Sequence, residues 1–172
     1  MKHLKAQNGK ELFPSVQHDH DACMQKQLQE AEQICRRREV RLTPLRRRVL
    51  EIISEHHEPI GAYAILARLA EEGKGGPPTV YRALDFLMAQ GLIHRVASMN
   101  AYVVCARPGV PHAAQFLICR SCRVLAELDD ASIETAIRNC AARAGFTVQE
   151  QTVENFGLCP NCRNVDLGGT EN

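Results

Sequence analysis

Two cysteine pairs in the last third of the chain constrain its fold more than any other feature. They are Cys119-Arg-Ser-Cys122 and Cys159-Pro-Asn-Cys162, separated by 36 residues. Two C-x-x-C pairs can supply the four thiolates of a tetrahedral zinc site, because soft sulfur ligands prefer zinc to harder cations. Two unrelated pairs or a redox-active dithiol are the alternatives. The doubled motif favours a structural zinc in a small domain, since a helix and a strand fit inside the spacer.

The amino-terminal sequence and the composition indicate in which cellular compartment the protein is expected. The chain has 172 residues and eight cysteines, and it begins with the polar segment Met1-Lys2-His3-Leu4-Lys5, which lacks the apolar stretch of a secretory signal. Its apolar runs all fall short of the roughly 20 residues that a membrane-spanning helix needs. We therefore expect a cytoplasmic protein with no membrane partner, in which thiols stay reduced and metal binding is preferred to disulfides.

The pattern of apolar residues up to 105 predicts three or four helices followed by a β-hairpin. We expect helices over 24–40, from Thr43-Pro44 onward, over 61–72 and from Pro77 to Gly91, then strands over 92–96 and 101–105. The positions expected to be buried are Leu28, Ala31, Ile34, Cys35, Leu45, Val49, Ile52, Ile53, Ile65, Leu66, Leu69, Val80, Leu84 and Leu87. This order of elements is typical of a winged helix-turn-helix domain, whose last helix enters the DNA major groove.

The second half predicts a small α+β domain. A segment containing Pro108, Gly109 and Pro111 is typical of an inter-domain linker. Beyond it we expect strands over 115–119 and 124–128, a helix over 130–144 and a strand over 146–153. The positions expected to face inward on that helix are Ile133, Ile137 and Ala141.

Charge is distributed unevenly along the chain. The net charge is only +1, but residues 1–98 carry 15 Lys and Arg against 12 Asp and Glu, whereas residues 99–172 carry 6 against 8. Seven arginines lie between Arg36 and Arg48. Such a run forms either a solvated face or a phosphate-binding surface, and the sequence leaves both interpretations open.

A looser set of candidate ligands spans the hairpin, the linker and the second domain: His94, Cys105, His112 and Glu127. A metal site that draws ligands from two domains would couple metal binding to their relative orientation. Spacing alone favours a plainer interpretation, in which the histidines and the glutamate are surface residues and Cys105 is a buried thiol.

The remaining candidates are weaker. The ligand-rich group His18, His20, Asp21 and Cys23 falls in a segment expected to be mobile, and Cys35 and Cys140 are most simply buried thiols. The sequence contains no nucleophile elbow, H-E-x-x-H motif or Rossmann fingerprint. We therefore expect no enzyme activity and no small-molecule substrate.

Four segments together resemble the ferric uptake regulator (Fur) superfamily over residues 24–163. They are residues 41–44 (RLTP) before an arginine-rich helix, residues 78–84 (PTVYRAL), residues 91–93 (GLI) and the paired C-x-x-C, in the family's order and spacing. Within the superfamily the chain is most similar to the zinc uptake regulators, which are homodimeric repressors of zinc-acquisition genes. The resemblance implies an amino-terminal winged helix and a carboxy-terminal dimerisation domain.

The resemblance also changes the interpretation of the second ligand set. In similar proteins the positions of His94, Cys105, His112 and Glu127 form a regulatory zinc site, beside the structural zinc at Cys119, Cys122, Cys159 and Cys162. Iron and peroxide sensors carry further histidines before the first C-x-x-C and near the carboxy terminus, whereas this chain has no histidine after His112. A thiolate ligand favours zinc over Fe(II). We therefore expect two Zn²⁺ per chain.

The organisation implied by these observations is α+β: an amino-terminal winged helix-turn-helix domain and a small carboxy-terminal α/β dimerisation domain with structural zinc. The expected boundaries are a flexible tail (1–22), the DNA-binding domain (23–106), a linker (107–114), the dimerisation and metal-binding domain (115–165) and a second flexible tail (166–172). By the same resemblance, the expected DNA contacts are Tyr63, Thr79, Tyr81 and Arg82.

The function that the resemblance implies is a zinc-responsive repressor, which binds inverted-repeat operators in double-stranded DNA when it is loaded with zinc. One alternative is a regulator of the same superfamily that senses thiol oxidation or another metal, such as Fe, Ni or Mn. A further alternative is a zinc-ribbon adaptor that binds another protein and no DNA.

Overall fold

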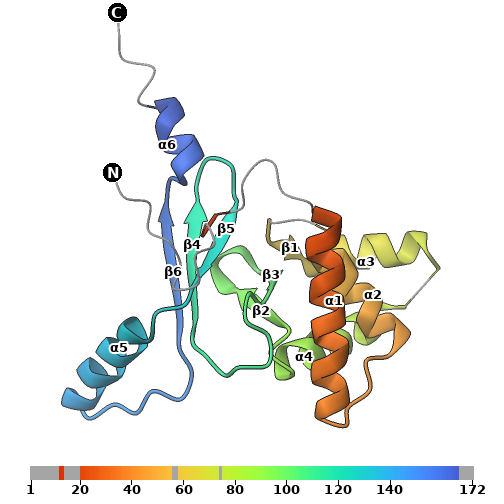
Figure 1. The fold of residues 1–172 in the computed structure, drawn as a ribbon, viewed down its shortest axis with the longest axis horizontal. Helices are drawn as coiled ribbons and strands as arrows, with labels where there is room; N and C mark the ends of the chain where they lie inside the picture. The colour runs from red at the N-terminus through yellow and green to blue at the C-terminus, as the bar shows by residue number, and fades with distance from the viewer. Residues whose placement is uncertain (1–11, 14–19, 56–57, 74, 167–172) are drawn as a thin grey trace, which may run out of the picture. The chain divides into compact units, whose positions relative to one another are not determined.

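The computed structural model describes residues 12–13, 20–55, 58–73 and 75–166 and divides the chain into two compact units (Figure 1). The helical unit spans Val16–Pro111, and the sheet unit comprises Met1–Ser15 and His112–Asn172. The elements of the helical unit are α1 (His20–Arg37), α2 (Pro44–Ser54), β1 (Ile60–Gly61), α3 (Ala62–Glu71), α4 (Pro77–Ala89), β2 (Ile93–Val96), the 3₁₀ turn η1 (Ala97–Met99) and β3 (Ala101–Val104). Those of the sheet unit are β4 (Ala114–Cys119), β5 (Leu125–Leu128), α5 (Ala131–Arg143), β6 (Thr152–Gly157) and α6 (Pro160–Asp166).

The four helices of the helical unit share one apolar core. Nearly all the positions expected to be buried lie in it with less than a tenth of their surface exposed, and Leu45 and Leu66 are partly buried at its edge. The N-cap of α2 is Thr43, whose hydroxyl accepts a hydrogen bond from the Arg46 N–H, and Pro44 occupies the first turn. The helical pattern in the sequence is therefore confirmed.

The arginine-rich start of α2 is largely engaged within the helical unit. Arg47 pairs with Glu32 and Glu51, and Arg48 binds Glu72 at 2.6 Å and also pairs with Glu51 and Glu55. These hydrogen bonds raise the pKa of Arg48 above its usual range. The guanidinium of Arg46 stacks on a ring of α4, with 3.6 Å between its central carbon and the centroid of Phe86. Part of the arginine run is thus structural; the exposed members are Arg36, Arg37, Arg38 and Arg41.

A three-stranded antiparallel sheet of order β1-β3-β2 completes the helical unit and forms the wing. Its register pairs His94 with Val103 and Val96 with Ala101. The hairpin expected at residues 97–100 is present: a 3₁₀ turn ends at Asn100, which adopts a left-handed conformation with φ of 47°. Asparagine tolerates this conformation better than most residues, so the connection can be short.

The sheet unit has a mixed sheet of order β5-β4-β6, in which β5 is antiparallel and β6 parallel to the central strand. The strand expected over 146–153 was placed too early. Gly145 has a φ of 73° and the Phe146 N–H bonds to the Ala141 carbonyl, so this stretch closes the end of α5. β6 begins at Thr152, opposite Ala114, and continues to Gly157.

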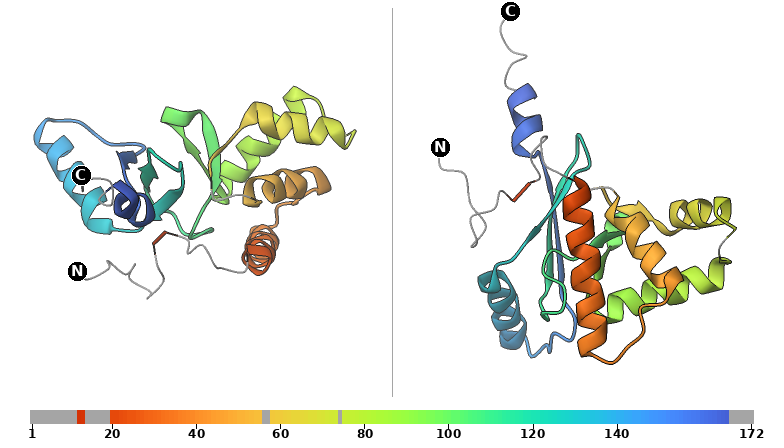
Figure 2. Two further views of the ribbon diagram at one scale, coloured as in Figure 1. Left: turned by 90° about the horizontal axis from the view of Figure 1, so that it is seen from above. Right: turned by 45° about the vertical axis from the view of Figure 1, so that its right-hand side comes forward.

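The inward stripe expected on α5 was also wrong for the single chain. None of the residues of α5 is buried, and Ile137 is 36% exposed. Figures 1 and 2 show α5 beside the end of the sheet where β4 and β6 begin, and α6 at the opposite end. The apolar spacing was correct for a helix, but among the described residues no element buries that stripe.

The fold class expected from the sequence is confirmed: the chain is α+β, with a helical amino-terminal region and a carboxy-terminal sheet unit that holds a four-cysteine cluster. The finer domain boundaries stay predictions. Most of the two expected tails, including His18, lies outside the described residues. Over the part of the chain that the structure describes, every helix is too short or too polar to cross a membrane.

The core of the helical unit generates a stability prediction on α3. Leu69 is fully buried, whereas Leu66 on the same helix is only partly buried. Leu69→Ala is expected to lower the free energy of unfolding by about 3 kcal/mol, because it removes buried apolar surface and leaves a cavity. The matched variant Leu66→Ala should cost about half as much. Urea denaturation of both variants in excess zinc tests this, and equal losses would contradict the core assignment.

Candidate metal centre and DNA-binding surface

The four cysteines of the two C-x-x-C pairs come together at one end of the sheet unit. Cys119 ends β4, and the turn that carries Cys122 is closed by hydrogen bonds from the Cys119 N–H to the Val124 carbonyl and from the Arg123 N–H to the Cys119 carbonyl. β6 runs parallel to β4 and delivers Cys159 to the same end, and Cys162 lies in the first turn of α6. The parallel pairing of β4 and β6 therefore unites pairs that are 36 residues apart.

The spacing of the sulfur atoms fits a tetrahedral metal cage. All four Sγ atoms lie within 4.8 Å of one another, and those of Cys122 and Cys159 are 3.7 Å apart. In a tetrahedron with zinc–sulfur bonds of about 2.3 Å, neighbouring sulfurs are about 3.8 Å apart. A disulfide requires about 2.05 Å between its sulfurs, and all four cysteines are free thiols. The cluster is thus a candidate structural metal site, with the donor set that zinc prefers.

The thiol pKa values of Cys119 and Cys122 are shifted in opposite directions within the cluster. Burial raises the pKa of Cys119, but hydrogen bonds from the N–H groups of Cys122 and Cys159 outweigh it and lower the pKa to about 6. At Cys122 a backbone hydrogen bond from Val124 lowers the pKa, but burial and the neighbouring sulfurs raise it to about 12. Four thiolates at this distance would repel one another, so a complete tetrahedral set of sulfur ligands requires a divalent ion that displaces the remaining protons.

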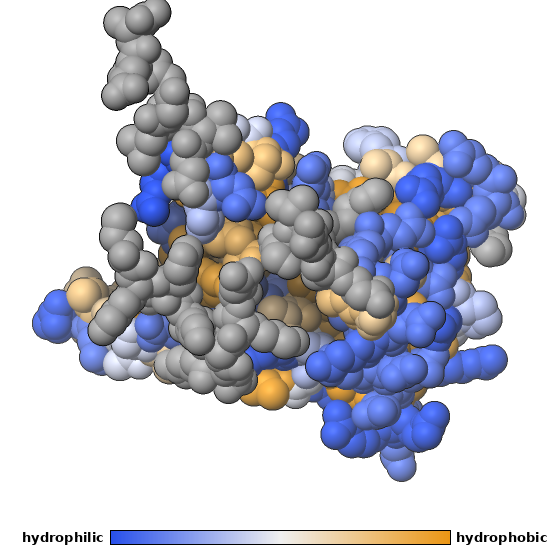
Figure 3. Space-filling view, turned by 45° about the horizontal axis from the view of Figure 1, so that its top comes forward, coloured by the Kyte–Doolittle hydropathy of each residue, from blue (hydrophilic) through white to orange (hydrophobic). Residues whose placement is uncertain are grey.

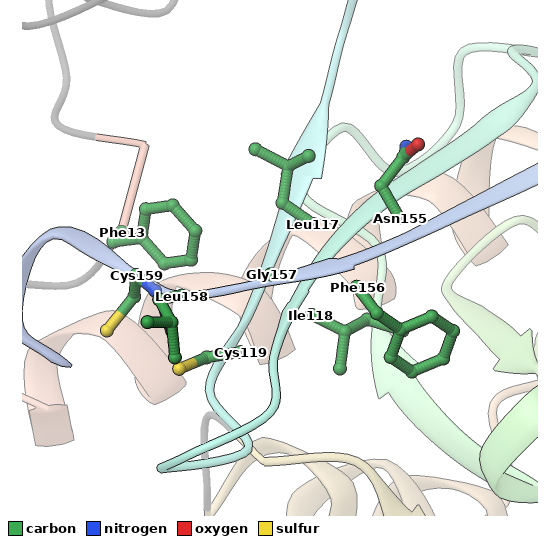
Figure 4. A pocket seen from close by; sticks show the side chains of 9 residues that line it. All are labelled: Phe13, Leu117, Ile118, Cys119, Asn155, Phe156, Gly157, Leu158 and Cys159. Atoms are coloured by element: carbon green, nitrogen blue, oxygen red, sulfur yellow. Dashed lines mark hydrogen bonds between the residues drawn. The ribbon is translucent and has the colours of Figure 1, made fainter. Parts of the chain in front are cut away.

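A shallow pocket adjoins the cluster on the sheet unit. It is lined by residues of β4, β6 and the loop that follows β6, including Cys119 and Cys159. Figure 4 shows the ring of Phe13 over this pocket, beside Cys159 and Leu158. Phe13 therefore lines the same pocket as two of the four cysteines, although the sequence predicts that it lies in a flexible tail.

The second set of candidate ligands forms one pair in each unit. In the helical unit, His94 lies on β2 and Cys105 directly follows β3, and their ligand atoms lie within 4.8 Å of each other. The Cys105 N–H bonds to the Leu92 carbonyl, which continues the register of the hairpin. Since side chains alternate along a strand, His94 and Cys105 project from the same face of the wing.

The other pair belongs to the sheet unit. His112 precedes β4, Glu127 lies on β5, and the His112 Nε2 is 2.7 Å from the Glu127 carboxylate. Both side chains are well buried, with 11% and 5% of their surface exposed. This contact holds the imidazole and the carboxylate next to each other, and both groups are of the ligand types that zinc binds. The plainer interpretation, with surface histidines and a solvated glutamate, does not fit this pair.

The candidate DNA contacts lie on exposed faces of α3 and α4. α4 buries Val80, Leu84 and Leu87 and turns Thr79, Tyr81 and Arg82 to solvent. Tyr63 on α3 is 80% exposed and Tyr81 is 42% exposed, so both side chains are accessible to a partner. Figure 3 shows that polar and charged side chains dominate the face of the helical unit in view.

The weaker candidate ligands Cys35, Cys140 and His20 lie outside both ligand sets. Cys35 is buried in the core of the helical unit, and burial raises its thiol pKa, as expected for an inert cysteine. Cys140 is exposed on α5, where it accepts a hydrogen bond from Arg143, so the expectation of a buried thiol was wrong there. His20 lies at the start of α1, where its ring contacts the Glu55 carbonyl at 2.7 Å.

A winged helix whose fourth helix leaves one face exposed, joined to a unit with a four-cysteine cluster, is the arrangement of a class of metal-binding, DNA-binding proteins. The chain belongs to the ferric uptake regulator family, whose model matches residues 37–156. The zinc uptake regulation protein of Escherichia coli K12 is 42% identical over 144 residues, which cover 83% of this chain and 84% of that protein. The zinc uptake regulation protein of Mycobacterium tuberculosis is 33% identical over 92 residues, which cover 52% and 68%.

Comparison with solved structures also finds zinc uptake regulators among the similar proteins. A zinc uptake regulator complexed with zinc and DNA has a TM-score of 0.78 and 41% identity, covering 84% of this chain and 97% of that one. Holo XcZur has a TM-score of 0.75 and 41% identity, covering 80% and 96%. The chain is therefore a metal-responsive transcriptional regulator similar to zinc uptake regulators. It is not an enzyme, as its sequence predicted.

The four-cysteine cluster generates a prediction about folding. Cys122→Ala is expected to lower the bound zinc by about one ion per chain and the melting temperature by roughly 10 °C or more, because a structural metal site contributes folding free energy directly. The matched control is Cys140→Ala, which removes an exposed cysteine of the same unit and should change neither quantity. Metal analysis and thermal melting measure both, and an unchanged melt for Cys122→Ala would contradict the structural assignment.

Proposed function

We propose that the protein is a zinc-responsive repressor that binds operators of zinc-uptake genes when a second, regulatory zinc is bound. The observation that carries the proposal is the pair of ligand-type residues on each side of the linker: His94 and Cys105 before it, His112 and Glu127 after it. One ion bound by both pairs would fix the helical unit against the sheet unit. Two Zn²⁺ per chain follow from this ion and the one in the four-cysteine cluster.

The chemistry of the second ligand set supports zinc as the signal. Two imidazoles, a thiolate and a carboxylate match the ligand types of tetrahedral zinc, whereas Fe(II) prefers nitrogen and oxygen donors. The names of the E. coli relative and of the DNA-bound neighbour support the same assignment. The remaining candidates are a regulator of this family that responds to Fe, Ni or Mn, and one that responds to oxidation of Cys105.

The mechanism is thermodynamic linkage between zinc and DNA. Zinc at the shared site selects the arrangement of the two units that fits the operator, so each ligand strengthens the binding of the other by the same factor. Arg82 on α4 is proposed to contact a base edge or the minor groove, and Tyr63, Thr79 and Tyr81 to contact phosphates. An occupied promoter then excludes polymerase. A regulator of chromosomal genes acts in the cytoplasm, which also keeps the eight cysteines reduced.

A homodimer is the proposed binding form, because an inverted-repeat operator requires two-fold symmetry in the protein. Apolar side chains that one chain leaves uncovered on the sheet unit support this assembly, since a second copy would bury them. They are Ile137, Phe146, Phe156 and Leu158.

The identity of the regulatory metal is tested by DNA binding. The protein first selects its DNA from random duplexes in excess zinc. The affinity of the protein for this DNA is then measured at increasing buffered free Zn(II), Fe(II), Mn(II) or Ni(II) under reducing conditions, with bound metal counted at each point. We expect half-maximal binding at the lowest free concentration for Zn(II). Binding that responds to Fe(II) first, or to an oxidant at constant zinc, would favour the corresponding alternative.

The role of Cys105 generates a variant prediction. Cys105→Ala should leave a folded protein with about one zinc per chain, which needs at least about a hundredfold more free zinc to bind the selected DNA, because it lacks one of four ligands. Cys23→Ala removes a thiol outside both ligand sets and should behave as the parent. Normal zinc-dependent DNA binding by Cys105→Ala would refute the regulatory role of this residue.

A further inference from the structure

Arg38 joins three segments of the helical unit that are far apart in the sequence. It directly follows α1, and its guanidinium donates hydrogen bonds to the Gln90 carbonyl at 2.7 Å, the Gln90 side-chain oxygen at 3.2 Å and the Gly109 carbonyl at 3.2 Å. Gln90 ends α4, and Gly109 lies in the linker. We call Arg38, Gln90 and Gly109 the linker clasp.

The contact of Arg38 with α4 matches the electrostatics of a helix end. The last carbonyls of a helix lack partners within it and carry a partial negative charge, so a guanidinium there forms charge-assisted hydrogen bonds. Gln90 is the C-cap of α4, and Gly91 follows in a left-handed conformation with φ of 62°. Arg38 therefore fixes the end of the helix that carries Arg82.

The linker packs closely at the other side of the clasp. Gly109 has a φ of 83°, and a Cβ atom built on it would lie 3.0 Å from the Cδ1 of Ile34, which is buried in the core. A Cβ atom on Gly91 would be 4.0 Å from the Gly109 nitrogen. The backbone of the linker thus lies directly on α1 and on the end of α4, in a space that admits glycine.

Gln90 and Gly109 of the linker clasp each lie close in sequence or by hydrogen bonding to a candidate zinc ligand. Two residues beyond Gln90, the Leu92 carbonyl accepts a hydrogen bond from the Cys105 N–H at 3.0 Å. Three residues beyond Gly109 comes His112. The clasp is therefore the point at which α4, Cys105 and the segment leading to His112 meet through short covalent paths and hydrogen bonds.

We infer that Arg38 is a positioning residue that couples the regulatory zinc to α4 by holding the linker. This inference rests on the proposed function. An anchored linker restricts the positions that His112 can take relative to Cys105. This restriction lowers the entropic cost of assembling a shared zinc site. It also ties the ordering of that site to the end of α4. Arg38 itself contacts neither zinc nor DNA.

The test compares Arg38→Ala with Arg38→Lys and with the control Arg37→Ala, which removes an exposed arginine of α1. The measured quantity is the free zinc concentration that gives half-maximal binding of the selected DNA. Arg38→Ala should raise it roughly three- to tenfold, the range expected for lost charge-assisted hydrogen bonds at an exposed site. Arg38→Lys should give a smaller rise, because one ammonium cannot span the same acceptors, and Arg37→Ala should give none.

A second readout needs neither DNA nor bound regulatory zinc. In protein that retains only the four-cysteine zinc, amide hydrogen exchange at Gly109 and Val110 should be several-fold faster in Arg38→Ala than in the parent or in Arg37→Ala, because the linker is no longer anchored. The melting temperature should change little. Combining Arg38→Ala with Gly109→Ala should raise the required zinc by less than the product of the single effects, since both changes disrupt one clasp.

The outcomes separate this inference from the proposed function. If the parent protein binds DNA without regard to zinc, the proposed function fails. If the parent responds to zinc but Arg38→Ala requires no more zinc than Arg37→Ala, the clasp has no coupling role. If Arg38→Ala weakens DNA binding at saturating zinc and reduces its salt dependence, with unchanged half-maximal zinc, Arg38 is a phosphate contact and the inference is overturned.

Discussion

The convergence of four cysteines at the ends of β4 and β6 is the constraint on which the sheet unit depends. Among its described residues this unit buries few large side chains, among them Phe116 and Ile118, and no residue of α5 is buried. A small core of this kind gains much of its stability from a metal ion that joins its segments. A zinc ion between the two C-x-x-C pairs would tie the end of β4 to the end of β6 and to α6. His112 and Glu127 belong to the same unit, the first before β4 and the second on β5.

The two ligand sets differ in a way that suits different tasks. The four cysteines come from one unit and are brought together by strand pairing within it, so their ion can remain bound while the protein responds. The other candidate ligands form one pair in each unit, on either side of the linker, and in the proposed mechanism an ion shared between them is the exchangeable one. The proposal thus assigns permanent and exchangeable zinc to different placements of ligands along the chain.

Much of the fold could be predicted because it depends on local patterns. The stripe of Val80, Leu84 and Leu87 and the Thr43-Pro44 start signal each specify a helix within a few residues of sequence. The start of β6 could not be placed in this way, because it is set by pairing with Ala114, far away in the sequence. The apolar stripe on α5 was expected to face a core, but the described part of the chain does not bury it. Periodicity reports that a face is apolar but not what covers it.

The candidate sites show the same difference between features set by local sequence patterns and features set by contacts between distant segments. The doubled C-x-x-C identified one cluster directly, whereas the second ligand set became convincing only through resemblance to a family. The arginine run gave no hint that Arg47 and Arg48 pair with glutamates or that Arg38 reaches residues 90 and 109, since these contacts join distant segments. Spacing in sequence carries such information only when the partners lie within a turn or a strand of each other.

Linkage between zinc and DNA is tested most directly by measuring both sides of the thermodynamic cycle. The affinity of the second site for zinc is determined with and without the selected DNA, and the affinity for DNA with and without zinc at that site. Reciprocity requires the two ratios to be equal, and we expect both to lie in or above the range of about 5 to 150 that is typical of coupled sites. A second-site zinc affinity that is the same with and without DNA would contradict the proposed mechanism.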